Sequence, residues 1–402
     1  MEPVTIDDGT GAERPAGQRS ALVTLAVALF LAMTTWFSAS AVLPQLRDRW
    51  DLTTSAASWL TIAVQLGFVV GALVLAMTSA ADVVPPRRLI LFGSLGAAMA
   101  NLGLLVVPGP ASAIGLRLAT GACLAAVYPP AMKAMSTWFR AGRGVALGVM
   151  VGALTLGSAA PHLVNTLGGM SWQGVVAITS VATVVGGLMA EFAVRDGPFP
   201  FPVSGFDPAR ARAVLSNQGV RLATVGYFGH MWELYAMWAW VGAFYADRLD
   251  SARAGSLMAF LVIGVGAGGS VLGGVLGDRW GRVPSTIVSL LFSGAMAGVI
   301  GWIGNTSLLV VVGLVWGFWV VADSAQFSAA VTEWADPESV GTALTLQLAS
   351  GFVLTVITIW LVPVVESRLG WGWAFAMLVP GPIVGVIAMR RLGELAHDPD
   401  RQ

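Results

Sequence analysis

Charge is scarce in this chain of 402 residues: Asp, Glu, Lys and Arg together make up 11%, against 56% hydrophobic residues. An average soluble domain carries about twice that share of charge, so the composition argues against one. Cysteine is almost absent, and because Cys123 stands alone no disulfide can form within the chain. The three histidines, His162, His230 and His397, have no ligand-type neighbours at suitable spacing, so we expect no metal site and no cofactor. The zero net charge argues against a nucleic-acid partner.

Long apolar runs of about 20 residues, separated by short polar breaks, fill the chain from Ala21 to Met389. Runs of this length match the roughly 30 Å hydrocarbon core of a bilayer at about 1.5 Å per helical residue. The 49 glycines suit helices that approach one another closely in a membrane. The sequence therefore predicts an all-α membrane protein. The twelve expected spans are 21–44, 56–79, 87–107, 111–135, 143–166, 172–194, 218–245, 255–277, 284–303, 306–331, 339–365 and 371–390.

An even number of spans places both termini on one side, and the basic residues indicate which side. With both termini in the cytoplasm, 16 of the 22 Lys and Arg residues lie inside and five outside, leaving Arg117 within the membrane. The first apolar run is too long for the core of a signal peptide, so we expect it to be retained. We predict a multi-pass protein of the cell membrane, in a bacterium the inner membrane.

The longest polar break divides the twelve spans into six and six. After the fourth span of each half, Ser136-Thr-Trp-Phe with Gly144-Val-Ala-Leu resembles Thr332-Glu-Trp-Ala with Gly341-Thr-Ala-Leu. Two pseudo-symmetric six-helix bundles of this kind are a transporter architecture. The predicted segments are a cytoplasmic tail (1–20), a first half (21–194), a cytoplasmic linker (195–217), a second half (218–391) and a second tail (392–402).

The segment between the eighth and ninth spans, Gly274-Val-Leu-Gly-Asp-Arg-Trp-Gly-Arg, resembles the signature loop of the major facilitator superfamily. The first-half copy, Ala80-Ala-Asp-Val-Val-Pro-Pro-Arg-Arg, keeps the aspartate and the basic pair. Arg117 with Gly121 in the fourth span is similar to the RxxxG pattern of that family. The resemblance covers essentially the whole chain, and its general look is loosely similar to the branch of nitrate/nitrite porters and cyanate permeases.

The resemblance implies a major-facilitator-type fold and assigns a gating role to the loop residues Asp82, Asp278, Arg279 and Arg282. In this family such an aspartate is thought to meet the N-terminus of the eleventh helix, which here lies near Glu338 to Gly341. A carboxylate is favourable at the positive end of a helix dipole. We therefore expect a contact that forms and breaks as the protein changes state.

The seventh span contains ionisable residues, which are costly in a membrane and need a partner or a wet cavity. His230 and Glu233 are three residues apart, so they share a helix face with Met237. An imidazole beside a carboxylate can relay protons. The alternative is a structural hydrogen-bonded pair that holds this span to a neighbour.

The tenth span has one polar and indole stripe at helical spacing, formed by Trp316, Trp319, Asp323 and Gln326. We predict that Asp323 binds a proton or a cationic group, or pairs with an arginine; the alternative is an ion pair at a gate. Arg117 offsets a substrate anion or holds Glu233 or Asp323, unless it extends to the headgroups. Further candidates for the cavity wall are Trp36, Gln65, Tyr128 and Gln347.

These residues predict a secondary active transporter of a small solute, coupled to protons and working as a monomer in the lipid bilayer. Few amide and acidic side chains lie in the spans, which disfavours a large sugar and leaves a small organic or inorganic anion. The rival substrate class is amphipathic or cationic drugs, exported by means of the indole rings and a buried acid. A transporter-like sensor or a scramblase is a third possibility. The sequence shows no nucleophile–base pair and no set of metal ligands, so we do not expect an enzyme.

Overall fold

The protein is described by a computed structural model that covers residues 15–78, 80–139, 142–168, 171–199, 207 and 210–396; the side chains of Thr54, Ala81 and Asp82 are not described. Within these ranges all regular structure is helical and there is no strand. The helices are α1 (Gln18–Ala32), η1 (Met33–Thr35), α2 (Ser38–Ala41), α3 (Leu43–Trp50), α4 (Thr54–Met77), α5 (Ala80–Val83), α6 (Pro86–Gly103), α7 (Pro110–Leu124), α8 (Tyr128–Ser136), α9 (Arg143–Gly168), α10 (Trp172–Ala193), α11 (Ala211–Ser216), α12 (Gln218–Arg248), α13 (Ala252–Trp280), α14 (Arg282–Ile300), α15 (Thr306–Ala322), α16 (Ser324–Trp334), α17 (Val340–Leu369), α18 (Trp371–Ala376) and α19 (Pro380–Ala396).

Ten helical segments of the described chain are long and apolar enough to cross a membrane. The other two predicted spans, 87–107 and 218–245, correspond to α6 and α12. These two helices are less apolar because α6 begins with a pair of arginines and α12 carries His230 and Glu233. Both still pack along their neighbours, α6 against α7 and α10, and α12 against α13, α17 and α19. The predicted all-α membrane fold is confirmed.

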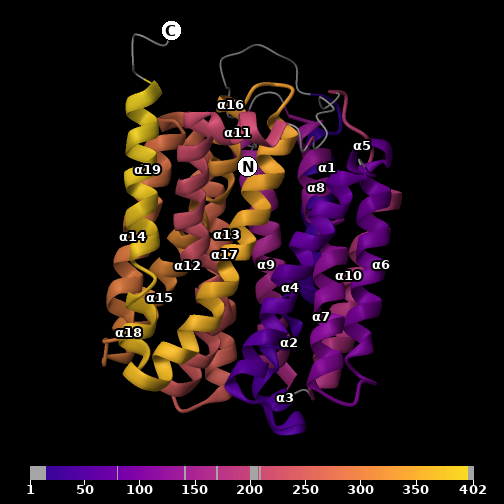
Figure 1. Cartoon of the computed structure of the whole chain (residues 1–402). Helices are drawn as coiled ribbons and strands as arrows, with labels where there is room; N and C mark the ends of the chain where they lie inside the picture. The colour runs from indigo at the N-terminus through magenta and orange to yellow at the C-terminus, as the bar shows by residue number, and fades with distance from the viewer. Residues whose placement is uncertain are drawn as a thin grey trace, which may run out of the picture.

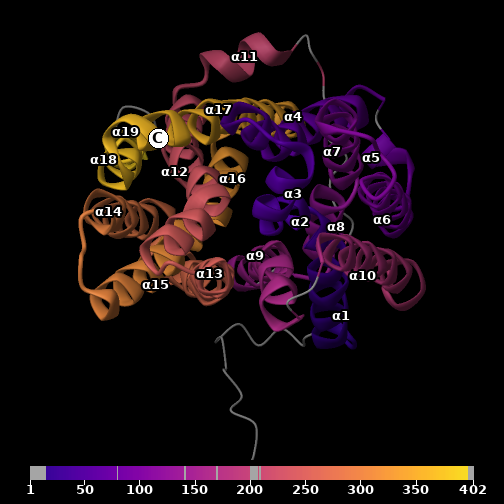
Figure 2. The ribbon, with the colours of Figure 1, turned by 90° about the horizontal axis from the view of Figure 1, so that it is seen from below.

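The helices form two bundles that lie side by side. The first contains α1 to α10 and the second α12 to α19, and α11 lies at one end, at the edge of the second bundle next to α12 and α17 (Figures 1 and 2). The bundles meet along α9 against α13 and along α4 against α17. At the first of these seams, Ser270 of α13 donates a hydrogen bond to the carbonyl of Gly148 at 3.0 Å. We name the two ends of the molecule the α11 end and the α3 end; α1 begins and α19 finishes at the α11 end (Figure 1).

Two glycines of α13 set the close approach of α13 to α15. A Cβ atom added at Gly273 would lie 1.7 Å from the carbonyl oxygen of Ala322. One added at Gly269 would lie 1.8 Å from the carbonyl oxygen of Phe318. Only a residue without a side chain fits where two backbones approach this closely.

Replacing Gly273 with alanine is therefore expected to force α13 and α15 apart and to lower stability by roughly 3 kcal/mol or more, at or above the usual cost of overpacking. Gly264→Ala on the same helix is the matched control, because its nearest neighbour, Leu156 Cδ2, would lie 3.7 Å away. Thermal melting of the purified variants in detergent measures the difference. Equal melting temperatures for the two variants would contradict the close approach.

Four of the predicted spans are broken rather than continuous. The breaks fall at Met33–Val42, Ala125–Val127, Asp323 and Met377–Val379. Proline explains two of them, since Pro129 and Pro380 open the helices that follow and cannot continue a helix from before. The breaks at Met33–Val42 and at Asp323 contain no proline. Buried side chains from other helices contact both, Arg117 at the first and His230 at the second.

Candidate functional site

Arg117 of α7 lies fully buried against the break in the first helix. Its guanidinium donates hydrogen bonds to three backbone carbonyls and two side chains. These are the carbonyls of Leu60 at 3.3 Å, Thr35 at 3.0 Å and Trp36, the hydroxyl of Ser38 at 3.3 Å and the amide oxygen of Asn101 at 3.2 Å. Thr35 and Trp36 lie where α1 gives way to η1 and α2. The arginine therefore satisfies carbonyls that the broken helix leaves without an intrahelical donor.

This geometry bears on two interpretations of Arg117. No described carboxylate lies within ion-pair distance of it, so in this structure Arg117 pairs with neither Glu233 nor Asp323; a pairing in another conformation stays a prediction. The reason is that both carboxylates face helices of the other bundle. The alternative, that Arg117 extends to the headgroups, is wrong because its side chain is 0% exposed.

His230 of α12 pairs with Asp323 at the junction of α15 and α16. The distance from His230 Nδ1 to Asp323 Oδ1 is 2.8 Å, and both side chains are 2% exposed. Ser324 Oγ lies 3.1 Å from the other imidazole nitrogen, Nε2. The rings of Tyr227 and Phe327 both contact the imidazole and also contact each other. Asp323 therefore lies just after the end of α15, and the buried His230 contacts both Asp323 and Ser324, the first residue of α16.

Glu233 lies one turn further along α12 and has a different set of partners. Trp316 of α15 donates its indole N–H to Oε1 at 2.5 Å, and Ser293 of α14 donates its hydroxyl to Oε2 at 2.9 Å. The carboxylate is 0% exposed. The predicted face shared by His230 and Glu233 exists, but the two side chains do not pair with each other. Each instead connects α12 to other helices of the second bundle.

The remaining candidates of the cavity wall are scattered. Met237 is buried in α12, and Trp319 stacks at 4.9 Å on Phe292, an exposed ring of α14. Trp319 therefore lies at the outside of the second bundle, away from Trp316, and the predicted single stripe is wrong. Gln347 is buried and donates to the carbonyl of Phe327 at 3.5 Å, whereas Tyr128 is only half-buried. Trp36 is buried against rings of the second bundle, as described below, and Gln65 is fully buried in α4, the helix that packs along α17.

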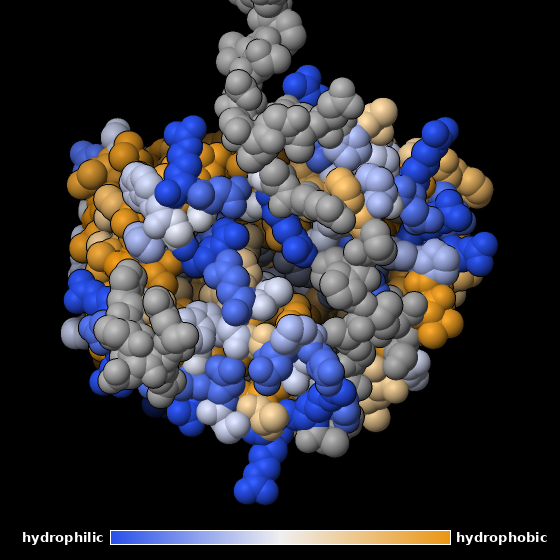
Figure 3. Space-filling view, turned by 90° about the horizontal axis from the view of Figure 1, so that it is seen from above, coloured by the Kyte–Doolittle hydropathy of each residue, from blue (hydrophilic) through white to orange (hydrophobic). Residues whose placement is uncertain are grey.

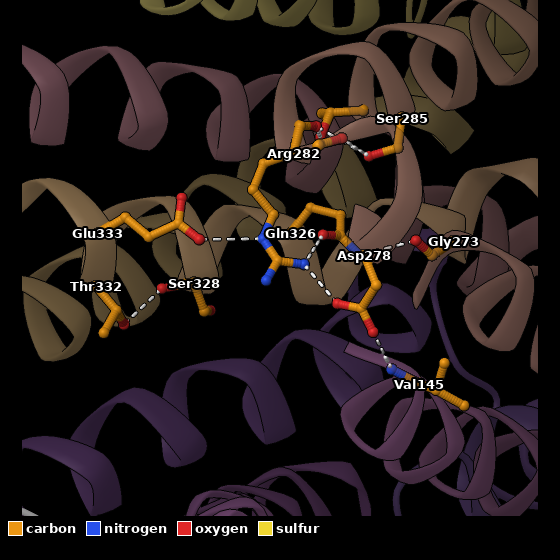
Figure 4. Close-up of polar contacts among 11 residues, drawn as sticks. Val145, Gly273, Asp278, Arg282, Ser285, Gln326, Ser328, Thr332 and Glu333 are labelled. Carbon is orange, nitrogen blue, oxygen red and sulfur yellow. Dashed lines mark hydrogen bonds and ion pairs between the residues drawn. The ribbon is translucent and has the colours of Figure 1, made fainter. Parts of the chain in front are cut away.

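A polar cluster at the α11 end includes the predicted gating loop (Figure 4). Arg282 is its centre, with contacts to Asp278 at 3.5 Å, Glu333 at 3.2 Å and Gln326 at 2.9 Å. Gln326, predicted in the substrate pathway, belongs to this cluster and donates in turn to the carbonyl of Gly273. The cluster holds the start of α14 to α13 and α16.

Asp278 also reaches across to the first bundle. Its Oδ2 atom accepts a hydrogen bond from the backbone N–H of Val145 at 3.2 Å, in the first turn of α9 (Figure 4). The expected partner near Glu338 to Gly341, at the start of α17, is therefore wrong. α17 belongs to the same bundle as Asp278, whereas α9 is the helix that packs along α13 from the other bundle. Arg279 is exposed, and the side chain of Asp82 lies outside the described part of the chain.

The comparisons with known proteins agree with this arrangement. The sequence model of the family described as Major Facilitator Superfamily matches residues 25–322, well over half of the chain. The chain belongs to the major facilitator superfamily. Its fold is similar to the crystal structure of the human organic anion transporter MFSD10 (TETRAN), with a TM-score of 0.70, 14% identity, and coverage of 94% of this chain and 100% of that chain. The comparison with curated proteins gives no match.

Membership in this superfamily confirms the predicted fold class. It also confirms that the chain is a secondary transporter. The chain is an integral, multi-pass membrane protein. Its resemblance to nitrate/nitrite porters and cyanate permeases stays a prediction. Among the residues that the structure describes, no group of His, Cys, Asp and Glu is placed to hold a metal ion.

A group of aromatic side chains in this superfamily member was not predicted from the sequence, apart from one residue. Six aromatic side chains from both bundles meet between them, which we name the cross-bundle aromatic cluster: Trp36, Phe37, Phe68, Tyr235, Trp238 and Phe352. Of these only Trp36 was a candidate. The signal was present, because each ring lies well inside its predicted span, where an interface anchor is not expected.

Proposed function

We propose that this transporter moves a small organic anion together with protons, by alternating access. In this scheme the predicted halves, 21–194 and 218–391, move against each other around a site between them. We further propose that the α11 end faces the cytoplasm, since most basic residues lie in the connections at that end. A single chain is expected to suffice, in a bacterium in the inner membrane.

The buried carboxylates of the second bundle carry the proton part of this proposal. A charged group at mid-bilayer costs at least about 2.5–3.5 kcal/mol on insertion scales. Asp323 with His230, and Glu233 with two neutral donors, place two carboxylates and an imidazole together among α12, α14, α15 and α16. Groups that can be neutral or charged in such a place are suited to take up and release protons.

Alternating access is supported by contacts between the bundles that can form and break. Asp278 touches the start of α9 through one hydrogen bond to a backbone N–H. An added Cβ at Gly144, also in the first turn of α9, would lie 2.2 Å from Asp278 Oδ1, so the carboxylate lies directly against this turn. Polar side chains surround a recess near the centre of the α11 end (Figure 3). A recess at one end fits a protein that opens its interior to one side at a time.

An anion is supported by the charge distribution of the first bundle. Arg117 is fully buried and faces only neutral acceptors among the described residues. Its positive charge is therefore not offset by a nearby carboxylate. The similar structure MFSD10 is that of an organic anion transporter. A cationic drug, by contrast, needs an acid in the cavity, and both buried acids already have partners within the second bundle.

The variants Glu233→Gln and Asp323→Asn are expected to abolish accumulation of the anion driven by a proton gradient, while exchange of labelled for unlabelled anion continues. The amides keep the shape of the carboxylates but do not carry the proton. The measurement uses purified protein in liposomes, an imposed pH gradient, and a panel of labelled carboxylates and sulfonates. Liposomes without protein provide the blank, because weak acids cross lipid unaided.

Glu394→Gln is the matched control, because this glutamate is exposed near the end of α19. Normal accumulation by both E233Q and D323N would show that the proton relay is wrong. Transport of a cationic dye such as ethidium, with no anion of the panel moved, would favour the rival class of cationic substrates.

A further inference from the structure

The rings of the cross-bundle aromatic cluster contact one another across the seam between the bundles. Trp36 stacks on Tyr235 at 5.9 Å between ring centroids, with 28° between their planes. Phe68 of α4 contacts Phe352 of α17 at 4.7 Å, and Phe37 contacts Trp238 at 5.8 Å. In each of these pairs one ring belongs to the first bundle and the other to the second. Movement of the bundles must therefore separate apolar faces that are now covered.

Polar atoms without partners lie among these rings. The indole N–H groups of Trp36 and Trp238 are buried and have no hydrogen-bond partner among the described residues. Both amide atoms of Gln65 are in the same condition, and Gln65 precedes Phe68 by one turn of α4. An unsatisfied buried polar group costs about 1–3 kcal/mol, so such atoms usually await a partner. Three of the four are on N–H donors, and the missing partner is accordingly an acceptor.

The nearest buried charge favours an acceptor that is negative. Arg117 holds the backbone carbonyl of Trp36, the residue whose ring is at the centre of the cluster. No described carboxylate lies within ion-pair distance of this guanidinium. In a low-dielectric interior its field extends to the neighbouring residues and attracts an anion. The aromatic rings, the N–H donors without partners and the nearby guanidinium together suit a ligand that is both aromatic and anionic.

We propose that the cross-bundle aromatic cluster is a substrate site for a small aromatic anion, an arene carboxylate or sulfonate. The inference rests on the proposed function and names the class of anion. The ring of the substrate takes the place of the contacts that Trp36 and Phe68 now make with Tyr235 and Phe352. Its anionic oxygens accept hydrogen bonds from Trp36 Nε1, Trp238 Nε1 and Gln65 Nε2.

The test compares two anions that differ only in the π face. Benzenesulfonate stays charged at all working pH values and does not cross lipid unaided, and cyclohexanesulfonate has the same charge and similar size. Benzenesulfonate is expected to raise the melting temperature of the purified full chain and to bind at least tenfold more tightly than cyclohexanesulfonate. In liposomes, benzenesulfonate is expected either to be taken up itself or to inhibit the uptake of other labelled anions. Cyclohexanesulfonate is expected to do so more weakly.

Variants separate binding from folding. Gln65→Met removes an amide without partners, so the free protein is expected to melt at an equal or higher temperature while its affinity for benzenesulfonate falls roughly tenfold. Trp36→Phe keeps a ring and loses the N–H, and is expected to bind more weakly than the parent but better than Trp36→Ala. Trp240→Phe is the control and should leave affinity unchanged, because Trp240 bonds to the carbonyl of Ile359 within the second bundle.

The outcomes distinguish this inference from the proposed function. Equal binding of both sulfonates, or full affinity in both Q65M and W36A, would overturn the aromatic site while leaving anion transport intact. Transport of aliphatic carboxylates but not of any aromatic anion would do the same. If no anion binds or moves and a cationic dye does, the proposed function fails and the aromatic-anion site fails with it.

Discussion

Replacing Arg117 with alanine is expected to destabilise the first bundle by about 3 kcal/mol or more. The substitution removes the arginine donor from the carbonyl of Trp36 in an interior that offers no water. The carbonyl of Thr35 keeps the hydroxyl of Ser38 as a donor at 3.0 Å, and Leu60 lies within the continuous helix α4. One buried carbonyl without a partner costs about 1–3 kcal/mol, and the space left by the arginine side chain adds the cost of a cavity. Relief from burying a charge acts in the opposite direction. It is small here because all five acceptors already stabilise the guanidinium.

Arg117→Met separates the loss of hydrogen bonds from the loss of volume. Methionine fills most of the space of the arginine stem, so its stability loss reports the hydrogen bonds alone. Arg117→Lys keeps the charge but not the planar fork, and is expected to restore only part of the stability. Arg88→Ala is the surface control, because Arg88 is 57% exposed and its closest carboxylate, Glu191, is 3.9 Å away. Thermal and denaturant unfolding of the purified proteins measures all four.

A wild-type melting temperature in Arg117→Met would contradict this account. It would mean that the broken first helix finds other donors, and that Arg117 has a role only during transport. The liposome assay then becomes the deciding measurement. A stable R117M variant with no anion uptake would place the residue in the substrate pathway and not in the support of the fold.

The sequence predicts the fold well because a membrane imposes a length and a composition on each helix. Ten of the twelve spans meet that criterion in the structure, and the other two are long helices within the bundles. Breaks are harder to predict. Proline marks those at Ala125–Val127 and Met377–Val379, but the residue at the third break, Asp323, contacts His230, which is 93 residues away in the chain.

Partners of the buried polar residues were predicted less well, because helical periodicity gives the face of a residue and not the helix opposite. His230 and Glu233 share a face, yet they contact different positions on the neighbouring helices. For Asp278, family resemblance predicted the right kind of partner, a helix N-terminus. It predicted the wrong helix, because only the packing of α13 against α9 decides which N-terminus is near.

Breaking the buried pair of His230 and Asp323 is the second large effect. Asp323→Ala and His230→Ala are each expected to cost roughly 3–5 kcal/mol, because each leaves a buried polar partner uncompensated. Both side chains are 2% exposed and 2.8 Å apart. The double variant is expected to cost clearly less than the two single losses added together, since no uncompensated group is then left.

The experiment is a double-mutant cycle by equilibrium unfolding in detergent micelles. Arg210 and Glu338 provide the matched surface pair: they are 3.2 Å apart but 38% and 80% exposed, so their coupling should stay below about 1 kcal/mol. Additive losses for His230 and Asp323 would show that the contact contributes no pairwise energy. In that case Asp323 would hold the α15–α16 junction through its backbone alone, and D323N would lose proton coupling only if the aspartate itself binds the proton. A large coupling energy would instead mean that proton binding by Asp323 affects how α12 packs against the α15–α16 junction. A proton could then change the packing of α12, the helix that bears two members of the cross-bundle aromatic cluster, Tyr235 and Trp238.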